Sequence, residues 1–111
     1  MTNAVILAAT LLTASWERFA DDGRLAANGR PFNPKAMTCA TRRFPLGTRL
    51  HVEDRLNHFS CDVVVTDRPA RRFGNRLDLS PAAFSLLNGL ALGLCPVRVT
   101  PIISRISLPP L

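Results

Sequence analysis

One carboxylate, Asp67, follows an apolar run of β-branched residues and precedes a turn rich in arginine. The run Val63–Thr66 is typical of a buried or half-buried strand. Pro69 cannot donate to a strand ladder and favours an extended conformation at Arg68, so the strand should end there. A carboxyl group that is fixed by a strand and exposed by a turn is a candidate for acid/base chemistry. The alternative is that Asp67 only forms ion pairs with the neighbouring arginines.

Composition and charge limit the classes of fold and ligand. The 111 residues suffice for one domain, and an apolar content of 47% suffices for one packed core. Nine prolines and six glycines indicate many turns, which favours a small, loop-rich β or α+β domain. The net charge of +6 predicts attraction to polyanions such as nucleic acid, anionic lipid surfaces or acidic cell-wall polymers. Since aromatic residues make up only 6%, a stacking platform for single-stranded nucleic acid would be thin.

The cysteines and histidines are not spaced like metal ligands. There is no Cys-x-x-Cys pair, and His51 and His58 do not lie at ligand spacing from the cysteines, so we expect no metal site. Cys39 and Cys61 flank two expected strands and can form a disulfide in an oxidising compartment. The alternative, which we favour for Cys95, is a buried small apolar side chain.

The first 14 residues allow two interpretations. Ala4–Ala14 is an apolar run that is well short of the roughly 20 residues that a membrane-spanning helix needs. It has the length of the apolar part of an export signal, although Met1–Asn3 carries no basic side chain. It also fits a buried first strand. We therefore expect residues 1–14 to be a degenerate signal segment or a first strand, and we expect no stable membrane span.

The rest of the chain reads as short strands separated by turns. Alternation and β-branched content predict strands at Met37–Ala40, Thr48–Glu53, Cys61–Thr66 and Pro96–Ile103. Ser80 can cap a helix whose first residue is Pro81 and which Gly89 ends. Ala20–Lys35 has the turn residues of a loop, and 104–111 is expected to be a flexible tail.

Seven segments then occur in one order along the chain: Ala14-Ser15-Trp16, Ala27-Asn28-Gly29, Ala36–Ala40, Phe44–Leu50, Val63–Arg68, Leu77–Ser80 and Pro96–Val99. This succession resembles the RlpA-like (rare lipoprotein A) double-psi β-barrel domain. The resemblance implies a mainly-β fold over residues 15–103, a six-stranded double-psi β-barrel with one short helix and a surface groove for glycan strands. It also implies lytic transglycosylase activity on peptidoglycan, and hence a protein exported to the periplasm or cell envelope. Expansins share this barrel and loosen wall polysaccharide without hydrolysing it.

The chain departs from the pattern of that family at several polar positions. The family's Asn-Asp-Arg-Gly-Pro signature reads Thr66–Ala70 here, which keeps the acid as Asp67. Arg30 stands where a glutamate commonly follows Ala-Asn-Gly, and Thr41 stands where a histidine is common. Glu17-Arg18 replaces the usual Tyr-Gly.

In lytic transglycosylation the 6-hydroxyl of muramic acid attacks the sugar, so one carboxyl group can protonate the leaving oxygen and then accept the hydroxyl proton. We assign both steps to Asp67, although an acid near neutral pH needs its pKa raised by burial and the neighbouring arginines favour the carboxylate. Thr41 is a second catalytic candidate as a hydrogen-bonding group that cannot shuttle a proton. The candidate substrate-binding residues are Trp16, Asn28, Arg30 and Arg68.

Two alternatives remain open. A non-catalytic, expansin-like module that binds peptidoglycan or polysaccharide is favoured by Arg30, Thr41 and the absence of a second acid. A basic nucleic-acid-binding barrel is favoured by the charge and by the loop Arg68–Arg76. We rank the transglycosylase first. We therefore expect peptidoglycan glycan strands as the partner, no nucleic acid, a monomer and no cofactor.

Overall fold

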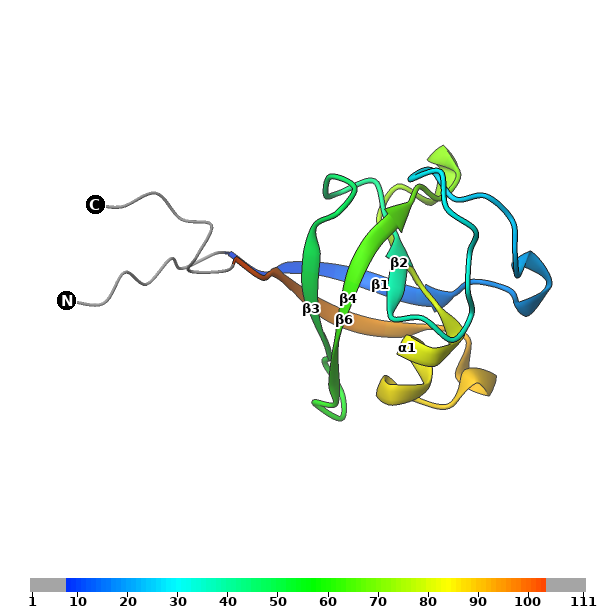
Figure 1. Cartoon of the computed structure of the whole chain (residues 1–111). Coiled ribbons are helices and arrows are strands. Elements are labelled where there is room, and N and C mark those ends of the chain that lie inside the picture. The colour runs from blue at the N-terminus through cyan, green and yellow to red at the C-terminus, as the bar shows by residue number, and fades with distance from the viewer. Residues whose placement is uncertain (1–7, 104–111) are drawn as a thin grey trace, which may run out of the picture.

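Six strands close into a barrel in the structure, a computed structural model that describes residues 8–103. Around the barrel the strands follow the order β1-β5-β2-β4-β3-β6 (Figure 1). The pairs β1/β5 and β2/β4 are parallel, and the other neighbours are antiparallel. The strands are β1 (Thr10–Trp16), β2 (Thr38–Ala40), β3 (Arg49–Asp54), β4 (Ser60–Asp67), β5 (Arg76–Leu79) and β6 (Cys95–Pro101). The expected mainly-β, six-stranded barrel with one short helix is therefore confirmed.

Alternation of apolar and polar residues fills the barrel with side chains from its strands. In β3, Leu50 and Val52 are buried whereas Arg49 and His51 are exposed. The same period-two pattern buries Val63 and Val65 in β4 and Val97 and Val99 in β6, because successive side chains of a strand point to opposite faces. The packing of these buried side chains fixes the positions of the strand ends.

The helix α1 (Pro81–Leu87) covers part of the barrel, against β4, β1 and β5 (Figure 1). The Ser80 hydroxyl accepts a hydrogen bond from the Ala83 amide at 3.2 Å and donates one to the Ala36 carbonyl at 2.6 Å. Pro81 stands at the first helical position, where its missing N–H costs nothing. Three 3-10 turns complete the described chain: η1 (Phe19–Asp21), η2 (Arg71–Phe73) and η3 (Leu90–Leu92).

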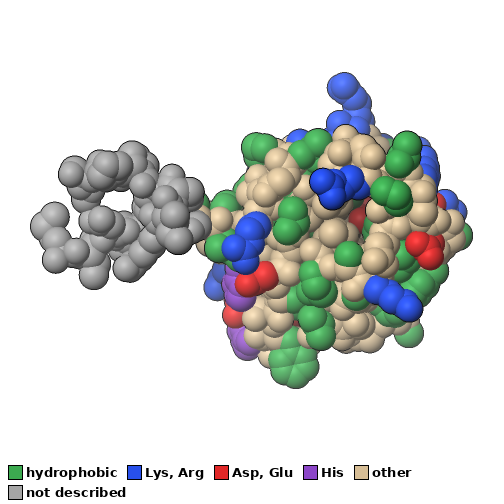
Figure 2. Space-filling model, in the orientation of Figure 1, with side chains coloured by type: hydrophobic (Ala, Val, Ile, Leu, Met, Phe, Trp, Pro, Cys, Tyr) green, Lys and Arg blue, Asp and Glu red, His purple; other side chains and the backbone are tan. Residues whose placement is uncertain are grey.

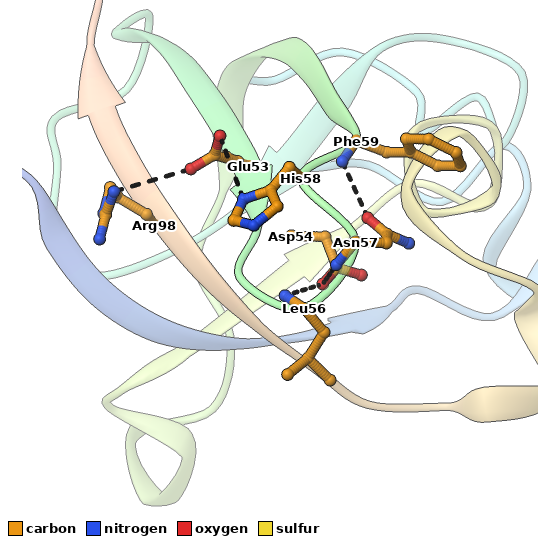
Figure 3. A network of polar contacts seen from close by, with 7 residues as sticks. All are labelled: Glu53, Asp54, Leu56, Asn57, His58, Phe59 and Arg98. Atoms are coloured by element: carbon orange, nitrogen blue, oxygen red, sulfur yellow. Dashed lines mark hydrogen bonds and ion pairs between the residues drawn. The ribbon is translucent and has the colours of Figure 1, made fainter.

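The connection between β3 and β4 is organised by a buried carboxylate (Figure 3). Asp54 is 0% exposed, and its Oδ1 accepts hydrogen bonds from the amides of Leu56 at 2.8 Å and Asn57 at 3.3 Å. The Asn57 side-chain amide in turn donates to the Leu87 carbonyl at 2.8 Å, which ties the loop to α1. His58 takes a left-handed backbone conformation, with φ of 66°. The network fixes the end of the hairpin that lies away from Asp67.

Three details differ from the expectations. Strand β1 runs from Thr10 to Trp16, so residues 10–14 fit the first-strand alternative and the boundary at residue 15 falls inside this strand; residues 1–7 and 104–111 lie outside the described residues. Leu77-Asp78-Leu79, where no strand was predicted, belongs to strand β5. Cys39, Cys61 and Cys95 are buried free thiols, so the Cys39–Cys61 disulfide is not formed in this structure.

Positive side chains are dispersed over the face of the molecule that Figure 2 draws. Figure 2 shows Lys and Arg side chains scattered over the visible face and not gathered into one patch. Within residues 8–103, no helix has the length and apolar character needed to cross a membrane.

Candidate active site

A cavity of about 640 Å³ lies where the carboxyl ends of the parallel strands meet. Strand pairing places one residue of each strand in a single row: Asp67 of β4 is opposite Ala40 of β2, Ala40 is opposite Asp78 of β5, and Asp78 is opposite Ser15 of β1. Asp67, Ala40 and Asp78 line the cavity, as does Glu17, which follows β1 directly. The barrel register thus brings together carboxyl groups that lie far apart in the chain.

Asp67 is held by backbone donors at the end of β4. Its Oδ1 accepts hydrogen bonds from the Ala27 amide at 2.9 Å and from the Arg68 amide at 2.8 Å. The first hydrogen bond connects the Ala26–Arg30 turn to strand β4. The second links the Asp67 side chain to the backbone of the next residue, just before Pro69. A negative carboxylate is the form that such donors stabilise. The structure therefore presents Asp67 as a positioned, partly buried carboxylate.

Glu17 lies in the same cavity in a different environment. Its amide donates to the Leu79 carbonyl at 2.8 Å, which continues the β1/β5 pairing by one residue. Its Oε1 is shielded from solvent and has no hydrogen-bond partner in the described part of the chain. Burial, and then the negative charges of Asp67, Asp78 and Asp21, raise the pKa of Glu17 from 4.5 to about 8.

In the sequence, Glu17 stands out only as the replacement of the tyrosine that is usual in the family. A local signal existed, because a carboxyl residue immediately after an apolar strand resembles the placement of Asp67 at the end of β4. What the sequence could not provide is the pairing that brings the two carboxyl groups to one cavity.

Asp78 also lines the cavity. The Ser15 hydroxyl donates a hydrogen bond to Asp78 Oδ1 across the β1/β5 pair. This contact satisfies one oxygen of the carboxylate and fixes its orientation, so Asp78 acts as a fixed negative charge beside Glu17.

Four arginines line the cavity, but each is engaged in another contact. Arg18 and Arg24 pair with Asp21 at 3.2 and 3.7 Å. Arg68 Nη1 donates to the carbonyls of Thr41 and Phe44, which fastens the end of β4 to the loop after β2. The Arg72 guanidinium lies 4.7 Å from the centre of the Phe73 ring. The cavity therefore has a mixed charge and not a purely cationic lining.

Trp16 belongs to the cavity lining, and its indole packs against Phe19. Trp16 Nε1 donates to the Leu90 carbonyl at 2.9 Å, and the indole forms an edge-to-face pair with Phe19, with ring centres 5.8 Å apart. Phe19 is 56% exposed, so the pair presents apolar surface to solvent. Such a surface is suited to the apolar face of a sugar ring.

The six candidate residues fall into three groups. Trp16, Asp67 and Arg68 line the cavity together. Asn28 and Arg30 line a separate cavity of about 150 Å³, where Asn28 Oδ1 accepts a hydrogen bond from the Arg30 amide at 3.0 Å and stabilises the turn. Thr41 is 0% exposed and lines neither cavity; its Oγ1 accepts a hydrogen bond from the Arg43 amide at 3.1 Å.

The described residues contain no group of three or more His, Cys, Asp or Glu side chains arranged to hold a metal ion. The cavity carboxyl groups are instead satisfied by backbone amides or a hydroxyl, or left without a donor, as described for Asp67, Asp78 and Glu17.

Comparisons with solved structures agree with the barrel. The chain is similar to an apo expansin of Clavibacter michiganensis, with a TM-score of 0.70 and 21% identity over 87% of this chain and 52% of that one. It is equally similar to a Streptomyces papain inhibitor, with a TM-score of 0.70 and 21% identity over 86% of this chain and 96% of the inhibitor. At these identities the likeness concerns the fold.

Sequence comparisons are more specific. The chain is 42% identical over 77 residues to a probable endolytic peptidoglycan transglycosylase RlpA of a Nostoc species, and 34% identical over 86 residues to the RlpA of Campylobacter jejuni. These matches cover 69% and 78% of this chain but only 21% and 31% of the relatives. A sequence model of the family described as lytic transglycolase matches residues 8–99. The chain therefore belongs to the lytic transglycolase family, in which this domain is the RlpA-like double-psi β-barrel.

Proposed function

We propose that this domain cleaves peptidoglycan glycan strands by lytic transglycosylation, with Asp67 as the catalytic carboxyl group. The observation that carries the proposal is the placement of Asp67 in the cavity, with Oδ1 held by the amides of Ala27 and Arg68. The names of the Nostoc and Campylobacter relatives support peptidoglycan as the substrate class.

The reaction uses a hydroxyl group of the substrate as the nucleophile. When the 6-hydroxyl of muramic acid attacks the anomeric carbon, its proton needs an acceptor, and the departing glycosidic oxygen needs a donor. In its simplest form Asp67 performs both transfers in turn, as the sequence analysis assumed. The two backbone donors on Asp67 suit the acceptor role directly, because they hold the carboxylate in one orientation.

The lining of the cavity suits a glycan strand with acidic substituents. Trp16 in the lining, with Phe19 packed against it, offers an apolar surface for a sugar ring. The exposed side chains of Arg18, Arg24 and Arg72 line the same cavity, so that besides their contacts with Asp21 and Phe73 their guanidinium groups can bind carboxylates of lactyl groups or stem peptides.

The direct test is a product assay on purified peptidoglycan with mass spectrometry of 1,6-anhydromuramic ends. Wild-type protein and Asp67→Asn are compared with Asp62→Asn, a control on the same strand whose carboxylate contacts His51 on the surface at 2.7 Å. We expect anhydro products from the wild type and the control, and a loss of about 100-fold or more in Asp67→Asn. Equal product from all three proteins would contradict the role of Asp67.

A second candidate is an expansin-like module that binds wall polysaccharide without cleaving it. It is favoured by the positions of Thr41, Asn28 and Arg30, none of which lines the cavity of Asp67. A variant of the Clavibacter expansin, similar in fold with a TM-score of 0.68, was solved in complex with cellohexaose. Wild-type protein that sediments with peptidoglycan sacculi and releases no anhydro product would support this candidate over the transglycosylase.

The location and assembly of the protein follow from this proposal. Because peptidoglycan lies outside the cytoplasm, we propose that the protein acts in the periplasm or cell envelope. A monomer is sufficient, because all the residues assigned to the cavity come from one chain. Size-exclusion chromatography with light scattering tests the assembly, and fractionation of cells tests the location.

A further inference from the structure

We propose that Glu17 is the general acid of the reaction, so that the cavity works with two carboxyl groups: Glu17 donates a proton to the leaving glycosidic oxygen and Asp67 accepts one from the attacking hydroxyl. This inference rests on the proposed function and replaces the single-carboxyl scheme. It assigns a second catalytic residue directly after strand β1, in the cavity that Asp67 lines from the end of β4.

The position of Glu17 is fixed by the barrel. The residue before it, Trp16, is the last of β1 and packs against the core, and the Glu17 amide is bonded to the Leu79 carbonyl of β5 at 2.8 Å. The side chain therefore starts from rigid backbone at the wall of the cavity. Its Oε1 is shielded from solvent and lacks a hydrogen-bond donor among residues 8–103. A charged oxygen in that position would be costly, whereas a neutral carboxyl group is tolerated.

The charges around Glu17 act in the same direction. Asp67 of β4, Asp78 of β5 and Asp21 of η1 all disfavour a further negative charge. Cys39 of β2 is also nearby, and burial raises the pKa of its thiol, so it stays neutral. With its pKa raised to about 8 by burial and these acids, Glu17 is about 90% protonated at pH 7.

The arginines of the cavity do not reverse this balance. Arg18 and Arg24 contact Asp21, Arg68 contacts two backbone carbonyls, and Arg72 lies over the Phe73 ring. Within the described part of the chain, none of the four donates to the buried Oε1 of Glu17.

Asp67 has the opposite environment, because two backbone amides donate to one of its oxygens whereas no group among the described residues donates to Glu17 Oε1. A carboxyl group without a donor beside one that accepts two amide hydrogen bonds is the pattern expected of an acid and its partner base. Asp78, bonded to the Ser15 hydroxyl, supplies a fixed negative charge that helps to keep Glu17 protonated.

The step balances without water or a cofactor. Glu17 gives its proton to the glycosidic oxygen as the bond from that oxygen to the anomeric carbon breaks. The 6-hydroxyl oxygen bonds to the anomeric carbon and passes its proton to Asp67. The products are a free hydroxyl on the departing strand and a 1,6-anhydro ring, and exchange with solvent returns the proton from Asp67 to Glu17.

The test compares wild-type protein, Glu17→Gln and Glu53→Gln in the anhydro-product assay between pH 5.5 and 9. Glu53, on β3, pairs with Arg98 and His58 outside the cavity (Figure 3), so its replacement is the matched control. We expect Glu17→Gln to lose about 100- to 10,000-fold in rate, which is the usual contribution of a general acid. Glu53→Gln should stay within about twofold of the wild type, because its carboxylate pairs with partly exposed side chains away from the cavity.

The pH profile separates a proton donor from a merely structural residue. The wild-type rate should fall as the pH rises above about 8, where Glu17 loses its proton, and the residual activity of Glu17→Gln should lack this fall. Glutamine has the shape and charge of a protonated glutamate, so the variant should fold; circular dichroism checks this.

The outcomes distinguish the two proposals. If the wild type releases no anhydro product, the proposed function fails and this inference fails with it. If the wild type is active and Glu17→Gln matches it in rate and pH profile, only the assignment of Glu17 is overturned. An independent readout is the titration of the Glu17 carboxyl carbon by NMR. A midpoint near 8 is expected, and one below about 5.5 would overturn the proposal even if a variant failed to fold.

Discussion

Replacing Glu17 by glutamine should change how the stability of the barrel depends on pH, whether or not any substrate is present. The folded state raises the pKa of Glu17 from 4.5 to about 8, so it binds the proton more tightly than the unfolded chain does. The stability that this proton supplies is complete below pH 4.5 and is lost as the pH rises through 8. The side-chain amide introduced by Glu17→Gln does not titrate, so the variant should not show this loss.

The size of the effect follows from the pKa. Each pKa unit corresponds to about 1.4 kcal/mol, so the rise from 4.5 to about 8 sets an upper limit of about 5 kcal/mol. Glu17 is only partly buried, and solvent screens part of the charge, so we expect about 2–3 kcal/mol. For a domain whose free energy of unfolding is about 5–15 kcal/mol, this is a measurable fraction.

The assay is urea denaturation of wild type, Glu17→Gln and Glu53→Gln at steps from pH 5 to pH 9. The difference in free energy of unfolding between wild type and Glu17→Gln should grow in favour of the variant up to about pH 8 and then level off. Glu53→Gln should run parallel to the wild type, because the Glu53 carboxylate contacts Arg98 and His58 and not the acids of the cavity. Parallel curves for all three proteins would refute the reasoning about Glu17 and its surroundings.

Three further predictions concern the rest of the barrel. Asp54→Ala should lower the free energy of unfolding by about 2–4 kcal/mol, because it removes a fully buried carboxylate that accepts hydrogen bonds from the amides of Leu56 and Asn57 in the β3–β4 loop (Figure 3). Asp62→Ala, at an exposed site, is the control and should cost less than about 1 kcal/mol in the same urea titration. The three cysteine thiols should resist a thiol reagent in the native protein and should all react in denaturant. The reason is their burial, which raises the pKa of Cys61 to about 11 and that of Cys95 to about 12. Fast labelling of the native protein would contradict this. A chain that begins at Ser15 should fail to give a cooperative thermal transition, since it lacks the β-pairing from Thr10 to Ala14, whereas a chain that begins at Ala8 should unfold cooperatively.

Local sequence signals predicted the end of strand β4 and the start of the helix, whereas strand β5 could be recognised only from its pairing with other strands. The Val63–Thr66 run and Pro69 placed Asp67 correctly at the end of a strand, and Ser80 with Pro81 placed the start of α1. Both features depend on neighbours in sequence, which is why the residues alone suffice. Strand β5 has only four residues, too few to show the alternation of apolar and polar side chains, so it was not predicted as a strand.

The site itself depends on contacts across the barrel. The pKa of Glu17 is raised by burial and then by Asp67 and Asp78, which lie on strands whose place beside β1 cannot be read from the sequence. Thr41 shows the opposite case: its place where the family commonly has a histidine suggested a polar role, yet it is completely buried in the turn after β2. Asn28 and Arg30 likewise form a local turn, and that turn reaches Asp67 through the Ala27 amide and not through their own side chains.

The pairing of β1 with β6 has a consequence for how the domain can be attached to other structures. Thr10 is opposite Val99, so the described chain enters and leaves the barrel at the same pole (Figure 1). The cavity lies at the other end of β1, beyond Trp16, at a distance of about 20 Å for a strand of this length. A linker to a second module or to a surface, joined at either end of the described chain, would thus attach to the end of the barrel opposite the cavity. The cavity would then remain accessible to a polymer on its own side.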